Sequence, residues 1–201
     1  MIQKLKLFFR SYTIVKTAYC FSNYLLSDLN RGRLRRDLFI GLGNLLPDLL
    51  SFAVIRPILW KLAGVKLMDY STTVIRLGAF TEYPPNLQIG KHFQINRNSY
   101  LDTNGQITIG DYVTISLNCS VLTISHSGLR HETDIIKPVF IKDHCIIYAN
   151  CTILPGAVLE KGVVLAAGSV LRGRTRPWSV YAGVPAKFVK LREFDEKTAK
   201  K

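Results

Sequence analysis

The stretch IKDHCIIYANCTILPGAVLEKGVVLAAGSVLRGRT, residues 141–175, decides the fold of this chain. An aliphatic residue stands at every sixth position: Ile141, Ile147, Ile153, Leu159, Leu165 and Leu171. Four positions after each of these comes a small or slim residue: Cys145, Cys151, Ala157, Val163, Ser169 and Thr175. A period of six fits neither an α-helix nor an ordinary strand and is typical of a parallel β-helix built from hexapeptide repeats. Each hexad is expected to form one face of a three-sided coil, with the aliphatic residue on the axis and the small residue at the corner.

The same period extends toward the N-terminus. Hexads run from Ile89 to Leu101, slip by two residues across 106–108, and resume from Ile109 to Val121. A two-residue insertion at a corner costs little, because each coil of a solenoid contacts only its neighbours. At about 18 residues a coil, the pattern predicts about five coils.

Composition divides the chain into three segments. Residues 1–65 contain no hexads and are rich in Leu, Phe, Ile and Arg, with eight Lys or Arg against two Asp in residues 1–40. They are predicted to form a basic, apolar, α-helical segment. Residues 66–180 form the all-β solenoid with an interrupting loop at 122–140, and residues 181–201 form a basic closing segment and a charged tail.

The sequence leaves two interpretations of the N-terminal segment open. The run from Leu38 to Val65 is largely apolar, but Asp48, Arg56 and Lys61 interrupt it, whereas a spanning helix needs about 20 apolar residues. The helices could pack on the solenoid or a neighbouring subunit, or they could present a basic amphipathic surface to anionic lipid. Polar residues also break the first apolar run, so no signal peptide is expected.

Charge and cysteine usage narrow the classes of partner. The formal net charge of +13 at pH 7 favours anionic partners. Because no zinc-finger spacing, helix-turn-helix pattern or RNP-like run accompanies it, a phosphorylated ligand or a membrane surface is preferred to nucleic acid. Cys119, Cys145 and Cys151 fall on the small-residue register, and Cys20 lies in the N-terminal segment. Such packing thiols suit a cytoplasmic protein without disulfides or a metal pair.

The repeat fails between Val121 and Ile141, where the chain reads LTISHSGLRHETDIIKPVF. Insertions in a solenoid project from one face, which is where its binding groups usually gather. This loop concentrates polar side chains and contains two histidines, His126 and His131. It is therefore the first place to look for chemistry.

The repeat, the loop SHSGLRHETD and the closing segment WSVYAGVPAKFVK resemble hexapeptide-repeat acyltransferases of the left-handed β-helix type over residues 75–192. With the preceding RPILWKLAGVKL they resemble in particular the O-acetyltransferases of exopolysaccharide and capsule synthesis; maltose and galactoside acetyltransferases share the core and tail. The resemblance alone implies the left hand of the β-helix, an exception to right-handed crossovers. It also implies a homotrimer with active sites between subunits, acetyl-CoA as co-substrate, no metal, and a sugar hydroxyl of a polysaccharide or glycolipid intermediate as acceptor.

The resemblance assigns roles to three residues around the acceptor. The general base is implied at His126, in the loop that follows the TIGD hexad at 108–111. An imidazole, with an ordinary pKa near neutrality, can take the proton of a hydroxyl as its oxygen attacks a thioester. Asn96, thirty residues upstream, is implied to orient the acceptor. His131 is a candidate for substrate binding or for a structural role in the loop.

For the coenzyme, the resemblance places pantetheine along Ala149 and Ala167-Gly168, where small side chains let it approach the backbone. Lys187 and Lys190 occupy positions where family members use Lys or Arg near the phosphates of CoA. Leu171-Arg172-Gly173 departs from the Val-Thr-Lys of many relatives, which puts the local contacts in doubt but leaves Arg172 as a phosphate partner.

Three other functions remain open from the sequence. The same resemblance allows N-acetylation of an amino sugar. A γ-class carbonic anhydrase-like protein would bind zinc through three histidines between subunits, here His92, His126 and His131, although the spacing of His92 does not match whole coils. A β-helix scaffold without catalysis is the third. Peripheral contact with the inner face of the cytoplasmic membrane is expected if the acceptor is lipid-linked.

Overall fold

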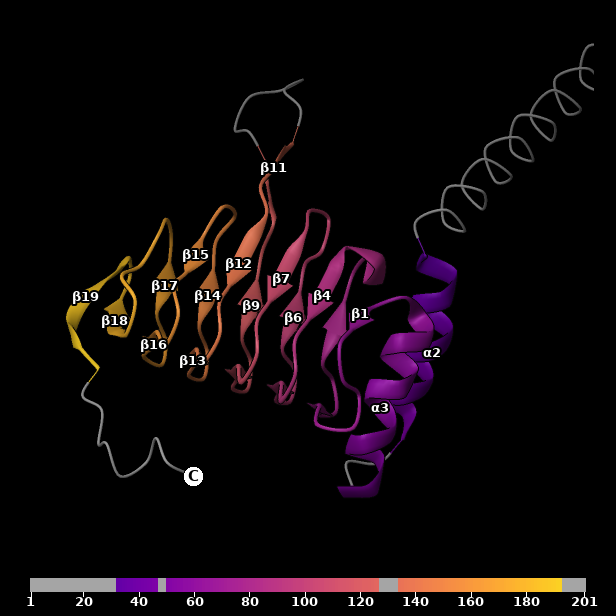
Figure 1. The fold of residues 1–201 in the computed structure, drawn as a ribbon. Helices are drawn as coiled ribbons and strands as arrows, with labels where there is room; N and C mark the ends of the chain where they lie inside the picture. Colours follow the sequence, from indigo (N-terminus) through magenta and orange to yellow (C-terminus); the bar gives the residue numbers. More distant parts are fainter. Residues whose placement is uncertain (1–31, 47–49, 127–133, 193–201) are drawn as a thin grey trace, which may run out of the picture.

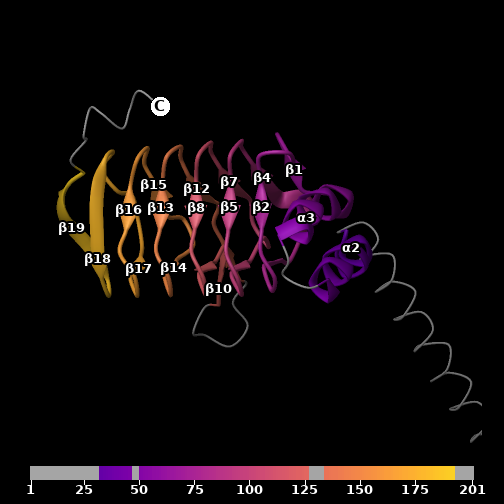
Figure 2. The same ribbon diagram turned by 90° about the horizontal axis from the view of Figure 1, so that it is seen from below.

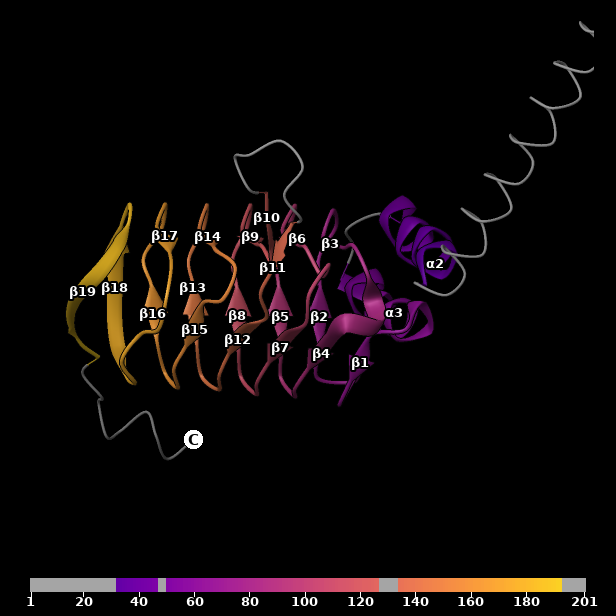
Figure 3. The same cartoon turned by 90° about the horizontal axis from the view of Figure 1, so that it is seen from above.

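A computed structural model describes residues 32–46, 50–126 and 134–192. Its main body is a three-sided prism of short parallel strands, with two helices at one end and an antiparallel strand pair at the other (Figure 1). Each side of the prism is one sheet. A short hairpin stands out from one long edge of the prism (Figures 1 and 3).

In each coil the chain contributes one strand to each of the three sheets in turn. The first consists of β1 (Lys66–Leu67), β4 (Leu87–Ile89), β7 (Ile107–Ile109), β12 (Val139–Ile141) and β15 (Val158–Leu159). The second consists of β2 (Val74–Ile75), β5 (Gln94–Ile95), β8 (Thr114–Ile115), β13 (Ile146–Ile147), β16 (Val164–Leu165), β18 (Ser179–Gly183) and β19 (Ala186–Leu191), and Figure 2 shows most of this row. The third consists of β3 (Phe80–Thr81), β6 (Tyr100–Leu101), β9 (Ser120–Val121), β14 (Thr152–Ile153) and β17 (Val170–Leu171). A 3-10 turn, η1 (Pro84–Asn86), joins β3 to β4.

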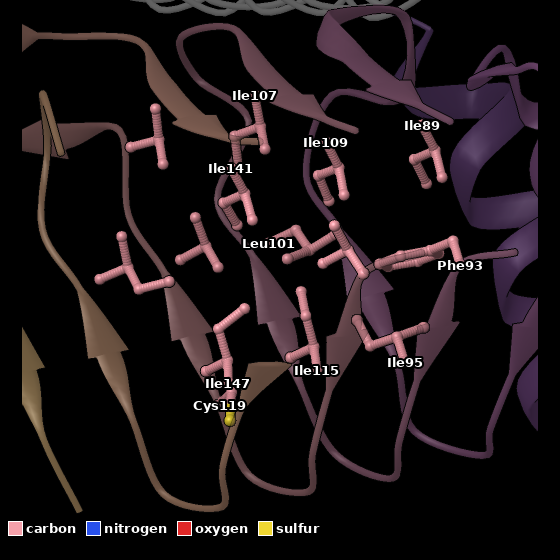
Figure 4. Packing of buried hydrophobic residues seen from close by; sticks show 14 of the residues in the cluster. Ile89, Phe93, Ile95, Leu101, Ile107, Ile109, Ile115, Cys119, Ile141 and Ile147 are labelled. Carbon is pink, nitrogen blue, oxygen red and sulfur yellow. The ribbon is translucent and has the colours of Figure 1, made fainter. Parts of the chain in front are cut away.

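The aliphatic register forms the core, as the period of six predicts. In the first sheet Ile89 pairs with Ile109, Ile109 with Ile141, and Ile141 with Leu159, and all four side chains are buried. Figure 4 shows Ile89, Ile109 and Ile141 stacked inside the prism, facing Ile95, Ile115 and Ile147 of the second sheet. The small register is buried too, from Cys145 to Thr175. The predicted solenoid, a left-handed parallel β-helix, is therefore confirmed.

The coils differ in length. Ile89 to Ile109 spans twenty residues, Ile109 to Ile141 thirty-two, and Ile141 to Leu159 eighteen. The first and third sheets have five strands each, which agrees with the predicted number of coils. One of these coils, however, precedes Ile89: it places Thr81, a buried polar residue, on the axis, so the aliphatic pattern did not reveal it.

Many corners contain a residue in the left-handed region of backbone space. At the edge between the first and second sheets these are His92, Tyr112, His144, Gly162 and Trp178, with φ between 48° and 73°. The residue directly after each of them is buried at the inside of the corner, and except for Phe93 it is small or slim, as Cys145 after His144. Tyr112 stacks on His92 and His144 at ring-centroid distances of 4.4 and 5.1 Å, and His144 lies 5.9 Å from Trp178. His144 is thus half-buried in an aromatic column.

Two helices cover the N-terminal end of the prism, α2 (Arg33–Leu45) and α3 (Leu50–Ala63) (Figures 1 and 2). The buried guanidinium of Arg56 joins them to the first coil: it donates to the carbonyl oxygens of Gly43 at 3.0 Å, Leu46 at 2.8 Å and Ile75 at 3.4 Å. A buried charge is tolerated because its donors are occupied by these carbonyls. In the described part of the chain, no helix has the length and apolarity needed to cross a membrane.

Candidate functional site

The β10–β11 hairpin brings His126 and Asp134 together. β10 (Ile124–Ser125) pairs antiparallel with β11 (Ile135–Ile136), so the residue after β10 and the residue before β11 lie side by side. The Nδ1 atom of His126 is 2.6 Å from the Oδ1 atom of Asp134, and the two side chains are 78% and 48% exposed. A carboxylate that accepts the Nδ1 proton fixes the tautomer in which Nε2 carries the lone pair. The geometry therefore provides an exposed, oriented proton acceptor.

Asp134 is the site residue that sequence reasoning missed. In the sequence, Asp134 is one of several polar residues of the loop at 122–140, and nothing in the repeat pattern sets it apart. The signal was the β-branched sequence on both sides, Ile124 before His126 and Ile135-Ile136 after Asp134, which predicts two short strands that bring their ends together. His131 lies outside the described residues.

Asn96, Ala149, Ala167 and Gly168 lie on one edge of the prism, between the second and third sheets; we call it the second–third edge. Asn96 follows β5, Ala149 follows β13, and Ala167 and Gly168 follow β16; the coil of β8 lies between those of β5 and β13. The backbone N–H of Gly168 donates to the carbonyl oxygen of Ala149 at 2.9 Å, which places these two neighbours in contact. The Asn96 side chain donates its Nδ2 proton to the carbonyl oxygen of Ile115 at 3.2 Å.

The second–third edge is open at its C-terminal end. Ala167 and Gly168 are exposed, and a Cβ placed on Gly168 would meet no atom within 4 Å. This space suits a ligand chain lying against the backbone.

The cationic candidates lie at the C-terminal end of the prism. Lys187 pairs with Ala182 and Lys190 with Val180 across the β18–β19 pair, and both lysines are exposed. The Gly183 N–H donates to the Ser169 hydroxyl at 3.1 Å, which fixes the end of β18 beside the second–third edge. Arg172, also exposed, follows β17 on the third sheet. The fold thus gathers the predicted coenzyme residues toward one end of the prism.

His126 lies on a different edge from Asn96, Ala149, Ala167 and Gly168, and shares its edge with Arg172. It follows β9 and precedes β12, at the edge between the third and first sheets, where Figures 1 and 3 show the hairpin projecting. One chain therefore does not bring His126 together with Asn96 or with Ala149 and Gly168. His92, a potential zinc ligand, lies on the remaining edge, between the first and second sheets.

A groove of about 690 Å³ lies over the C-terminal half of the first sheet. Phe140 and Val158 line it with apolar surface, and Glu160 lies between Lys142 at 2.7 Å and Arg174 at 3.6 Å. It contains none of the residues predicted from the sequence.

Other reactive groups of the described chain fit structural roles. The thiols of Cys119, Cys145 and Cys151 are buried, and burial raises the pKa of Cys145 to about 12. A raised pKa lowers the thiolate fraction and with it the reactivity. Among the described residues no three His, Cys, Asp or Glu gather as metal ligands.

A known family model matches the regular coils of the solenoid. The model of the bacterial transferase hexapeptide (six repeats) matches residues 138–173. The chain carries the bacterial transferase hexapeptide repeat. The matched residues run from β12 through β17, the regular coils after the hairpin.

Three relatives of this chain are named as acetyltransferases. A putative lipopolysaccharide biosynthesis O-acetyl transferase, WbbJ, of Escherichia coli K12 is 29% identical over 48% of this chain and 56% of its own length. A putative acetyltransferase of Staphylococcus aureus strain COL is 34% identical over 55% and 57%. The galactoside O-acetyltransferase of E. coli K12 is 29% identical over 55% and 57%. The chain spans just over half the length of the curated relatives it matches.

Solved structures share the fold. A hexapeptide-repeat acetyltransferase of Vibrio cholerae O1 biovar eltor, complexed with acetyl coenzyme A, superposes with a TM-score of 0.70 at 25% identity, over 81% of this chain and 89% of that one. A maltose O-acetyltransferase of Clostridium difficile 630 gives a TM-score of 0.72 at 23% identity, over 83% and 88%.

Proposed function

We propose that this hexapeptide-repeat protein transfers an acetyl group from acetyl-CoA to a hydroxyl of a sugar in a cell-surface polysaccharide or glycolipid intermediate. The contact between His126 and Asp134 is the observation that carries the proposal, because it supplies an oriented base on an exposed hairpin. The acetyltransferase names of the relatives and the acetyl-CoA complex of the Vibrio protein support the donor.

The proposed reaction needs one proton acceptor and no metal. The Nε2 atom of His126 takes the proton of the acceptor hydroxyl while the hydroxyl oxygen attacks the thioester carbonyl of acetyl-CoA. The tetrahedral intermediate collapses as the carbon–sulfur bond breaks, and the proton on His126 passes to the leaving thiolate of CoA. Asp134 stabilises the imidazolium that exists between these two steps.

The coenzyme is proposed to lie along the second–third edge. Pantetheine would run past Ala149 and Ala167-Gly168, where exposed backbone and small side chains leave room. Lys187 and Lys190 would face its phosphates, and Arg172 would approach them from the hairpin edge of a neighbouring subunit, a use that suits cations near a polyanionic ligand. Asn96, further along the same edge, would contact the acceptor.

This arrangement requires more than one subunit. His126 and the residues of the second–third edge, Ala149 and Ala167-Gly168, lie on different edges of a single prism, so the base must reach a coenzyme held by a neighbour. A homotrimer, with the hairpin edge of one subunit against the second–third edge of the next, would complete three such sites.

The decisive assay measures acetyl transfer from acetyl-CoA to a panel of glycan intermediates. His126→Ala should lower turnover by about 10² to 10⁴-fold, the usual contribution of a general base, with unchanged affinity for the coenzyme. His92→Ala is the matched control, because that exposed histidine lies on another edge. Near-normal turnover of His126→Ala on an authentic acceptor would refute the mechanism, and transfer only to amino sugars would replace O-acetylation by N-acetylation.

Subunit mixing tests the shared site. Trimers assembled from His126→Ala chains and Lys187→Ala/Lys190→Ala chains should regain activity at limiting acetyl-CoA, because some interfaces combine an intact base with intact lysines. Mixed trimers, verified by native mass spectrometry, that are no more active than the average of the two parents would place the whole site within one chain.

A further inference from the structure

Two exposed apolar stripes run along the helical end of the protein. On α2 the stripe consists of Leu34, Leu38, Leu42 and Leu45, which are 53%, 61%, 46% and 81% exposed. On α3 it consists of Ile55, Ile58 and Leu62, which are 39%, 42% and 44% exposed. Spacings of three and four residues keep each set on one side of its helix. We call these seven residues the apolar stripes.

The apolar stripes lie opposite the sides that hold the helices to the prism. On α2, the amide of Asn44 accepts from the Gly78 N–H at 3.1 Å, and Arg36 forms an ion pair with Glu82 at 3.1 Å. On α3, Trp60 and Arg56 are buried. Arg56 donates to the carbonyl oxygen of Gly43 in α2 and to that of Ile75 in the first coil. The helices are thus anchored on their inner sides, so the apolar stripes form a rigid surface that needs little ordering when it binds.

Charge selects among the possible occupants of this surface. Arg35 and Lys61 are exposed next to Leu34 and Leu62, so cations flank both stripes. A second copy bound through the same surface would bring its own Arg35 and Lys61 against these cations. Residues 1–31 of the same chain carry five Lys or Arg against one Asp, so their charge has the same sign. A partner with an apolar interior and a negatively charged surface would match both the apolar stripes and the cations beside them.

We propose that the apolar stripes of α2 and α3 dock on an anionic lipid bilayer. The leucines and isoleucines would enter the boundary between headgroups and acyl chains, while Arg35 and Lys61 remain at the level of the phosphates. Lys61 already lies over the Tyr70 ring, with Nζ 5.4 Å from its centroid, and Tyr70 is 46% exposed. A tyrosine and a lysine side by side are characteristic of the interfacial region of membranes.

Vesicle flotation of the full-length protein tests the proposal. Vesicles of equal parts phosphatidylglycerol and phosphatidylcholine should bind the protein, and vesicles of phosphatidylcholine alone should bind it much less. Leu38→Ser/Leu42→Ser/Leu45→Ser should weaken binding to the anionic vesicles by at least about tenfold, because three apolar side chains no longer leave water. Added salt should weaken the wild-type interaction, since charge contributes to it.

The control variant replaces exposed apolar residues at the opposite end of the prism. Val189 and Leu191 are 56% and 63% exposed, and Val189→Ser/Leu191→Ser should leave flotation unchanged. Thermal melting verifies that each variant folds, and light scattering reports the size of the assembly. The proposal is overturned if the wild-type protein ignores anionic vesicles at low salt or if the α2 variant floats like wild type. A change of assembly size in the α2 variant without a change in flotation would assign the surface to a second copy instead.

Discussion

His126 and Asp134 are separated by seven residues of sequence, and their Nδ1 and Oδ1 atoms lie 2.6 Å apart at the mouth of the β10–β11 hairpin. The β10–β11 pairing holds both backbones side by side. The His126 side chain is 78% exposed and that of Asp134 is 48% exposed. The imidazole is thus oriented without being buried, which suits its proposed role as a base that meets a coenzyme held by another subunit.

Replacing Asp134 by Asn should lower the turnover number by about 10 to 10²-fold, because an amide stabilises the imidazolium less than a carboxylate does. Steady-state kinetics should show the loss in kcat, with the KM for acetyl-CoA unchanged. Asp69→Asn, a substitution of a partly exposed aspartate in the first coil, is the control. An unchanged kcat in Asp134→Asn would mean that the contact has no part in the chemical step.

Lys187→Ala/Lys190→Ala should weaken CoA binding by about tenfold or more at low salt, since two charge-assisted contacts to phosphate are lost. Titration calorimetry should find a smaller loss with dephospho-CoA if one lysine faces the 3′-phosphate. Lys66→Ala/Lys91→Ala removes the same charge from exposed positions outside the second–third edge. If both double variants lose the same CoA affinity, the loss reflects the lower net charge of the protein and not a contact of Lys187 or Lys190 with phosphate.

Gly162→Ala should lower the stability by about 1 to 3 kcal/mol, the usual cost of overpacking. Gly162 has a φ of 73°, and a Cβ there would overlap the Trp178 ring. Trp178 in turn stacks against His144 and under Arg192, whose Nη1 donates to the carbonyls of His144 and Gly162 at 3.2 Å.

Gly168→Ala provides the comparison for Gly162→Ala in urea denaturation. Its φ of 70° is nearly the same, but a Cβ there meets open space. It should therefore show only the backbone cost of about 1 kcal/mol. Equal losses in the two variants would show that the Trp178 contact adds nothing.

Tyr100 should make the protein less stable in alkali. Burial, and then the neighbouring carboxylates of Glu82 and Asp102, raise the pKa of Tyr100 to about 12 from 10.0. Between these values the unfolded chain loses the phenolic proton while the folded chain keeps it, so the free energy of unfolding falls as pH rises. Urea midpoints at about pH 9 and about pH 11 should therefore differ more for wild type than for Tyr100→Phe. The same drop in both proteins would contradict the assignment.

The sequence by itself determined the solenoid, because one aliphatic residue in six, from Ile141 to Leu171, can be buried only if the chain turns after every hexad. It also determined where the repeat is interrupted and which small residues line the corners. It did not show the first coil, since Thr81 breaks the aliphatic pattern there. The role of Asp134 also escaped it, because a side-chain contact across a hairpin leaves no periodic mark.

Only the tertiary structure decided which candidates meet. Asn96, Ala149 and Gly168 lie far apart in sequence, yet they share one edge because successive coils stack in register; His126 lies on another edge because its hairpin inserts after the third sheet. The structure also decided which faces of α2 and α3 are buried. One side of α2 and α3 packs on the solenoid, where Arg56 and Asn44 anchor the helices. The leucines on the other side of α2 are exposed, and their docking on anionic lipid stays a prediction.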